Sequence, residues 1–321
     1  MKNILNITNG DCAVEIMEKA DIPGVFLPWR DVLHDGPVPE DLTLEKLSEV
    51  RAQFIIDKRW GEPEHIKQDF IERDNTLKSF AKYEKIILWF EHDLYDQLHL
   101  LQILDWFNQN RHKKTALSMI CVDQYLGMLS ADAMGGLFEY EEPVTESHLQ
   151  LSSRAWSAFR SSTPENWNAL LKTDMTSLPF LKGAIIRILE EYPSCSSGLS
   201  RTAQKALEII LQGEKRPGRI FALYQESEDR RFLGDSSFWG ILHEFLESSP
   251  PLLQLPEGKK LTLPTSPDQE LTLTQSGKEV LSGKKNWLEI TDQDRWIGGV
   301  HLTPENIWCW DSSSGSLVKR A

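Results

Sequence analysis

A cluster of titratable residues follows an apolar segment in the first third of the chain. Residues 86–90 (Ile-Ile-Leu-Trp-Phe) are followed directly by Glu91, His92 and Asp93. A carboxyl group beside an imidazole can transfer protons in catalysis, and both groups can bind a divalent cation. The alternative is that the acids only cap the next helix, since Asp and Glu are favoured in a first helical turn. Capping explains one of these carboxylates more easily than all of them together with Asp96, so we favour a site.

Three other short apolar segments also end in chemically capable residues. The segments are residues 3–8, 25–27 and 117–122. The residues after them are Asn9, Gly10 and Asp11; Arg30, Asp31, His34 and Asp35; and Asp123 and Gln124.

Roles for these residues follow from their side-chain chemistry. His92 is the first choice for acid–base work, and Arg30 could hold a phosphate or carboxylate with its planar fork. The spacing of the histidines fits no standard ligand pattern, so we assign no metal ligand. The expected catalytic residues are His92, Glu91, Asp93, Asp31 and His34, and the expected substrate-binding residues are Asn9, Gly10, Asp11, Arg30, Asp96 and Gln97.

The segments that carry these residues alternate between strand and helix character. After Asp93, leucines at positions 94, 98 and 101 recur near the helical period, which is typical of an amphipathic helix. Alternating strands and helices favour parallel strands, whose carboxyl ends share one edge of the sheet. Open α/β sheets bind their ligands at that edge. We therefore expect an α/β fold with a Rossmann-like parallel sheet in residues 1–145, and the polar residues together on one edge.

Composition and missing motifs argue against several classes of protein. The chain has 321 residues, which indicates two domains, and its formal net charge is -13, which disfavours general nucleic-acid binding. Its four Cys form no CxxC pair, so neither a zinc site nor a disulfide framework is indicated. GxGxxG, GxxxxGK[ST] and GxSxG motifs are missing, which disfavours nicotinamide-dependent hydride transfer and P-loop hydrolysis. No apolar run is long enough to span a bilayer, so we expect a cytoplasmic protein with no membrane partner.

Three segments together resemble a known family. Residues 7–11 (Ile-Thr-Asn-Gly-Asp), 29–38 (Trp-Arg-Asp-Val-Leu-His-Asp-Gly-Pro-Val) and 88–97 (Leu-Trp-Phe-Glu-His-Asp-Leu-Tyr-Asp-Gln) are similar to the bacterial family called domain of unknown function 1835. The resemblance covers about the first 130 residues. It implies that these segments form the family's signature, and it brings no established activity.

Residues 146–321 are expected to be mainly helical, with a module that resembles a winged helix. Three helical segments precede two short strand candidates, residues 252–255 and 271–273, and a final helix at 274–281. The third helix carries Asp235, Glu244 and Glu247 but no Lys or Arg, and such a face would repel phosphate. A structural or partner-binding module is therefore favoured over a DNA reader.

The tail has two interpretations. Arg295 and His301 could complete a cleft at the edge of the first domain, or the Trp-rich residues 294–311 could form a small hairpin that seals the domains. The second is slightly favoured, and residues 312–321 are expected to be frayed.

Two functions follow from these expectations. The first is an enzyme, a hydrolase or group transferase that acts on a small, phosphorylated molecule at the carboxyl edge of the sheet. The second is a regulatory protein whose first domain senses a ligand and whose second domain binds a partner or DNA. The sequence identifies neither a cofactor nor an oligomeric state.

Overall fold

The computed structural model describes residues 3–112, 114–262, 265–266 and 269–320. It has a mixed α/β fold and divides into two compact units. The first unit comprises Met1–Ile185 with Gly298–Val300, and the second comprises Ile186–Ile297 with His301–Ala321. Residues 146–185 thus group with the first unit. The boundary between sequence domains near residue 145 stays a prediction.

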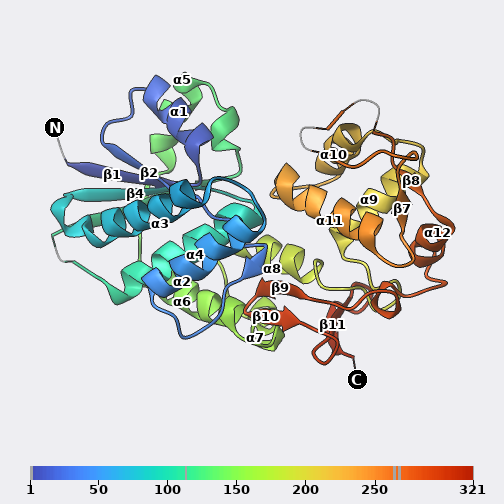
Figure 1. The fold of residues 1–321 in the computed structure, drawn as a ribbon. Helices are drawn as coiled ribbons and strands as arrows, with labels where there is room; N and C mark the ends of the chain where they lie inside the picture. Colours follow the sequence, from blue (N-terminus) through green and yellow to red (C-terminus); the bar gives the residue numbers. More distant parts are fainter. Residues whose placement is uncertain (1–2, 113, 263–264, 267–268, 321) are drawn as a thin grey trace. The chain divides into compact units, whose positions relative to one another are not determined.

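A five-stranded, mostly parallel sheet is the centre of the first unit, as predicted (Figure 1). The strand order is β2-β1-β4-β5-β6. All neighbours pair in parallel except β5 and β6, which are antiparallel. The strands are β1 (Ile4–Thr8), β2 (Val25–Pro28), β4 (Lys85–Glu91), β5 (Ala116–Val122) and β6 (Glu142–Pro143).

Helices cover both faces of this sheet (Figure 1). The central strand β4 is therefore apolar on both sides, and residues 86–90 are all at most 1% exposed. One face carries α1 (Asp11–Lys19), η2 (Leu126–Met128), α5 (Ala131–Gly136) and η3 (Leu137–Tyr140). The other side carries α2 (Leu44–Asp57), α3 (Pro63–Lys78), η1 (Phe80–Lys82), α4 (Leu94–Gln109) and α6 (Glu146–Arg160). The unit ends with α7 (Glu165–Ala169), η4 (Leu170–Lys172) and the first part of α8 (Leu181–Leu189).

Local signals in the sequence set where several helices begin. Thr43 caps α2 by accepting a hydrogen bond from the Lys46 backbone N–H, and Pro63 occupies the first turn of α3. Thr and Pro are start signals that can be read from the sequence, because the N–H groups of a first helical turn have no partner within the helix.

The strand ends share one edge of the sheet, although β4 and β5 continue past the ends of β1 and β2. Thr8 pairs with Pro28 on one side and Trp89 on the other, while Glu91 pairs with Val122. The chain runs from β1 to its neighbour β2 and later enters β4 on the opposite side of β1. The connections after β1 and β4 therefore diverge, which makes the gap between these strand ends the switch point of the sheet.

A short return of the chain completes the first unit. Val38 donates its backbone N–H to Gly298 O at 2.8 Å, and Gly299 donates to Phe159 O at 3.0 Å. A Cβ on Gly299 would lie only 1.8 Å from Arg160 O, so the close approach requires glycine. The strands around this return are β3 (Gly36–Pro37), β9 (Arg295–Gly298) and β10 (Val300–Leu302).

The second unit is mainly helical. The buried Arg187 of α8 forms ion pairs with Glu191 at 2.7 Å and with Glu228 at 2.6 Å, and these pairs connect parts of the second unit that are distant in sequence. The helices and the antiparallel pair lie close to where they were predicted: α9 (Arg201–Leu211), α10 (Pro217–Glu226), α11 (Asp235–Glu247), β7 (Leu253–Gln254), β8 (Thr272–Leu273) and α12 (Gln275–Leu281). A further turn is η5 (Trp287–Glu289).

The tail corrects one expectation. Residues 312–321 were expected to be frayed, but β12 (Ser316–Lys319) pairs antiparallel with β11 (Trp308–Asp311). The reversal is stabilised where Asp311 accepts hydrogen bonds from Ser313 and Ser314. Arg295 donates to Glu191, and His301 stacks on Trp296 at 4.3 Å, so both make contacts within the second unit.

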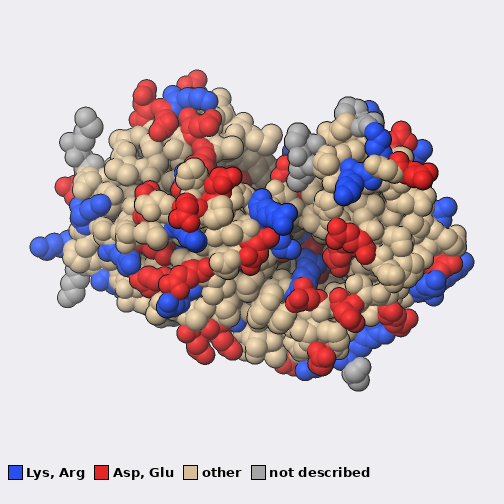
Figure 2. Space-filling view, viewed as in Figure 1, with Lys and Arg blue, Asp and Glu red and all other residues tan. Residues whose placement is uncertain are grey.

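Two further features concern the distribution of charge on the surface and the polarity of the helices. Acidic and basic side chains are interspersed over the face shown in Figure 2. Among the described residues, each helix is too short or too polar to cross a bilayer.

Candidate functional site at the carboxyl edge of the sheet

Asn9 connects the two strands at the switch point. It follows β1, and its Nδ2 donates at 2.9 Å to Glu91 Oε1 and at 2.9 Å to Asp96 Oδ2. Glu91 is the last residue of β4, and Asp96 lies in the first turn of α4. One amide group thus uses both of its protons on two carboxylates from another element. The predicted meeting of residues 9–11 with residues 91–96 is present.

Three buried carboxyl groups lie together beside Asn9. Glu91, Asp93 and Asp96 are at most 4% exposed, and one oxygen from each lies within 4.8 Å of the others. Burial, followed by the charge of Asp93, raises the pKa of Glu91 to about 8. Burial likewise raises the pKa of Asp93 to about 6 and the pKa of Asp96 well above its usual range. The three groups therefore do not all ionise at neutral pH.

The hydrogen bonds indicate where a proton is held. Asp96 accepts from Asn9 with one oxygen and from the Glu91 backbone N–H with the other, at 2.8 Å, so both of its oxygens are hydrogen-bonded. Glu91 Oε1 already accepts from Asn9 and from the Leu126 N–H at 2.7 Å. The side chains of Glu91 and Asp93 also form a hydrogen bond with one another, and a bond between two carboxyl groups requires a proton. We conclude that Glu91 and Asp93 share one proton.

The capping alternative holds for one residue only. Asp93 is the N-cap of α4, and its Oδ1 accepts from the Asp96 N–H at 3.2 Å. Glu91 lies before the helix and has different partners. A divalent cation could replace the shared proton, since carboxylate oxygens are the ligands that Mg²⁺ and Ca²⁺ prefer.

The first turn of α1 lies next to this cluster. Gly10 precedes the helix, no side chain caps the helix N-terminus, and no described atom lies within 4 Å of where a Gly10 Cβ would be. Arg30, just after β2, donates to Asp11 Oδ2 at 2.8 Å and Oδ1 at 2.6 Å. Both side chains are about half exposed, so this ion pair stabilises the fold little. The same arginine also contacts Asp69 of α3 at 3.3 Å.

His92 lies between two aromatic rings. Its ring centroid is 5.1 Å from Tyr125 and 6.0 Å from Phe180, and the residue is 7% exposed. It neighbours the carboxyl groups in sequence at the end of β4.

Asp31 and His34 lie in the loop of residues 29–39, and Asp31 bonds to this loop and to α2. Asp31 Oδ1 accepts from Arg51 Nε at 2.9 Å, and neither side chain of this pair is exposed. Arg51 also donates to the Asp35, Pro37 and Val32 carbonyls. These bonds fix the loop of residues 29–39. The ring of His34 lies 5.9 Å from Tyr95.

Sequence reasoning missed several groups that build the site. Tyr95 donates its hydroxyl to Asn9 O at 3.4 Å and packs on His99 at 4.4 Å. Burial lowers the pKa of His99 to about 3, so this ring is neutral. Gln97, predicted to bind substrate, is buried and donates to Glu91 O at 2.7 Å. His99 lies three residues after Asp96 and four after Tyr95, and this helical spacing could have indicated it, but only if the buried side of α4 were known.

Comparison with protein-family models finds no match, and comparison with curated proteins finds none either. The similarity of residues 7–11, 29–38 and 88–97 to domain of unknown function 1835 therefore stays a prediction from these motifs.

Proposed function

We propose that the carboxyl edge of the sheet is the active site of a hydrolase or group transferase whose substrate is a small, phosphorylated molecule. The observation that carries this proposal is the hydrogen bond between the buried carboxyl groups of Glu91 and Asp93, which Asn9 connects to the first turn of α1 at the switch point. A proton donor next to an anion-binding helix terminus is what transfer of a phosphorylated group requires. We also propose that the first unit is a Rossmann-like member of the 1835 family.

The substrate anion would bind at the start of α1. The N–H groups of a first helical turn attract negative charge, and the space beside Gly10 is open in the described structure. Arg30 would pivot from Asp11 to the anion, at small cost because an exposed ion pair is worth about 0–1 kcal/mol. Glu91, protonated at neutral pH, would then supply a proton through its pair with Asp93, and His92 would accept one.

Binding tests the first step. We would measure the melting temperature with inorganic phosphate, nucleoside phosphates and sugar phosphates, since a ligand that prefers the folded state raises it. At least one phosphorylated compound should raise the melting temperature of the wild type, and Arg30→Gln should reduce this rise. Lys19→Gln, at the other end of α1, is the matched control. An equal rise in Arg30→Gln would contradict the assignment of Arg30.

Turnover tests the second step. Loss of the stabilising compound would be followed by ³¹P NMR with the wild type, Glu91→Gln and His92→Asn. The wild type should consume the compound, and both variants should be slower by about 100-fold or more, the usual contribution of acid–base catalysis.

A second candidate is a ligand sensor. The near-complete burial of Glu91, Asp93 and Asp96 favours it, because carboxyl groups that position Asn9 need no contact with a substrate. In this proposal, the second unit contains a winged-helix-like module that binds a partner. Saturable binding without consumption of the compound would favour the sensor over the enzyme.

A further inference from the structure

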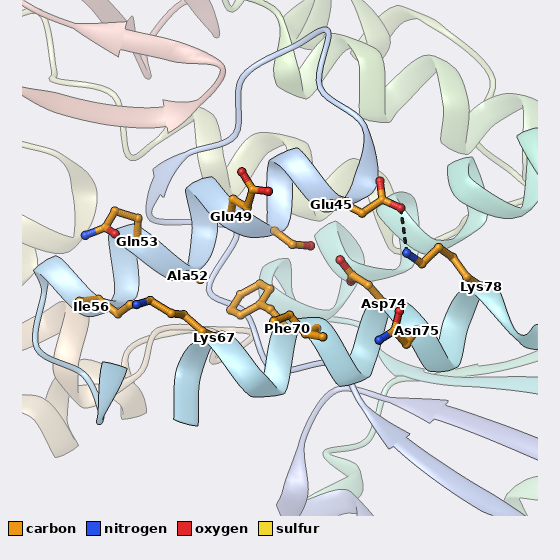
Figure 3. Close-up of a pocket in the computed structure, with 12 residues that line it drawn as sticks. Glu45, Glu49, Ala52, Gln53, Ile56, Lys67, Phe70, Asp74, Asn75 and Lys78 are labelled. Carbon is orange, nitrogen blue, oxygen red and sulfur yellow. Dashed lines mark hydrogen bonds and ion pairs between the residues drawn. The ribbon is translucent and has the colours of Figure 1, made fainter. Parts of the chain in front are cut away.

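A pocket of about 390 Å³ lies between α2 and α3, away from the carboxyl edge (Figure 3). It shares no residue with the carboxyl cluster described above. Its volume lies in the range of small-molecule sites. The lining residues are Glu45, Ser48, Glu49, Ala52, Gln53, Ile56, Lys67, Phe70, Ile71, Asp74, Asn75 and Lys78.

The middle of this pocket is apolar. Ala52 and Phe70 are buried, and Ile56 lies beside them on α2. Ile71 on α3 is 54% exposed, which is high for a large aliphatic side chain beside a hollow. An apolar body placed here would cover it and gain free energy by leaving water.

One end of the pocket carries charged groups of both signs. Glu45 is bonded to Lys78 at 3.0 Å. Asp74 of α3 is only 4% exposed, and in Figure 3 its carboxylate points into the gap between the helices. Its Oδ1 accepts from Arg73 at 3.0 Å. Arg73 does not line the pocket, because it stacks on Trp29 and Phe70 with centroid distances of 4.2 and 4.4 Å.

Each acid of the lining already pairs with a basic residue: Glu45 with Lys78, Glu49 with Lys46 and Asp74 with Arg73. Burial nevertheless raises the pKa of the Asp74 carboxyl group above its usual range. The charge of Asp74 is therefore incompletely compensated, and a further cation beside it would stabilise its ionised form.

We propose that this pocket binds a small amine with a compact apolar body. The ammonium group bonds to Asp74, with Ser48 and Asn75 as further hydrogen-bonding groups on either helix. The apolar body lies on Phe70, Ala52 and Ile56. The proposed activity at the carboxyl edge does not depend on this site.

The probe for this site is 2-phenylethylamine. Its neutral counterpart is 2-phenylethanol, and its anionic counterpart is 3-phenylpropionate. In ¹H–¹⁵N NMR titrations of the full chain, the amine should shift resonances of α2 and α3 saturably. The alcohol should bind about tenfold more weakly, because it lacks a charge-assisted hydrogen bond. Equal affinity of amine and alcohol, or amine-induced shifts confined to other elements, would overturn the proposal.

Variants separate charge from shape. Asp74→Asn should reduce amine affinity about tenfold and leave the alcohol unchanged. Because this change also removes a partner of Arg73, Ala52→Phe provides a second test: it fills the pocket with an apolar side chain and should abolish binding of both compounds. Glu72→Gln, on α3 outside the lining, is the matched control and should bind like the wild type. Wild-type affinity in a folded Ala52→Phe protein would also refute the site.

Discussion

At the scale of single residues, the three carboxyl groups beside Asn9 play different parts although they share one environment. Asp96 accepts two hydrogen bonds from donors that cannot turn away, so its charge is compensated. Glu91 and Asp93 bond to one another, and that hydrogen bond requires a proton between them. The hydrogen-bond partners, more than burial alone, decide which group is the acid.

Stability should therefore depend on pH through Glu91. The pKa of this carboxyl group is raised from 4.5 to about 8 on folding, so the folded state binds its proton more tightly than the unfolded state. The resulting stability is fully present below about pH 4.5 and is lost as the pH rises to about 8. Asp93, with a pKa of about 6, adds to the loss in the lower part of this range. Urea unfolding between pH 5 and about 9 would measure the decline.

Two amide substitutions test the position of the proton. Glu91→Gln keeps an acceptor for Asn9 and Leu126 and gives Asp93 a fixed donor, so its stability should vary less with pH and exceed that of the wild type near pH 8. Asp96→Asn places an NH₂ group opposite a hydrogen-bond donor, so it should lower the free energy of unfolding by about 1–3 kcal/mol. If Asp96→Asn were more stable than Glu91→Gln near pH 8, the assignment of the proton to the Glu91–Asp93 pair would be wrong.

At the scale of elements, the loop of residues 29–39 depends on one side chain of α2. Arg51 is fully buried and bonds to Asp31 and to three loop carbonyls. The backbone carbonyls of a loop lack the regular partners of a helix or strand, and the guanidinium group of Arg51 supplies partners for three of them. The loop carries Arg30 to the carboxyl edge, so α2 positions part of the candidate site from outside it.

Removing Arg51 should accordingly be costly. Arg51→Met leaves Asp31 as a buried, uncompensated charge, and we expect a loss of about 3–5 kcal/mol in the free energy of unfolding. Arg30→Gln removes an exposed ion pair of similar geometry and should change stability by less than about 1 kcal/mol. Urea unfolding of the two variants compares them directly, and similar losses would mean that the Arg51–Asp31 pair does not hold the loop.

At the scale of the whole molecule, the chain returns to its first unit near the end. Gly298 and Gly299 bring three residues back against Val38 and the end of α6. The first unit is therefore not continuous in sequence. A truncation before residue 298 would remove part of it.

Gly299→Ala tests this return. Its Cβ would lie 1.8 Å from Arg160 O, a backbone atom that cannot move alone. We expect the substitution to lower the free energy of unfolding by more than about 2 kcal/mol and to lower the melting temperature. Gly213→Ala is a useful contrast: its φ of 110° strains a side chain, but no described atom lies within 4 Å of its Cβ. A melting temperature for Gly299→Ala at or above that of the wild type would show that Gly299 is not packed closely against the end of α6.

The sequence was enough to predict four parallel strands, the shared edge at which they end and several helix starts. Each depends on local patterns: an apolar run that stops on polar residues, a capping Thr43, a Pro63 in a first turn. Because parallel strands point the same way, these patterns also predicted that Asn9 and Glu91 would meet at one edge.

The contacts of each polar residue became visible only in the folded structure. Asp31 and Asp96 look alike in sequence, but one fixes a loop through Arg51 and the other accepts from Asn9. Their partners lie 20 and 87 residues away, and no local pattern selects among so many donors. The tail was misjudged for a similar reason: β12 exists because β11 offers it a partner, and pairing of a strand is decided by what lies beside it.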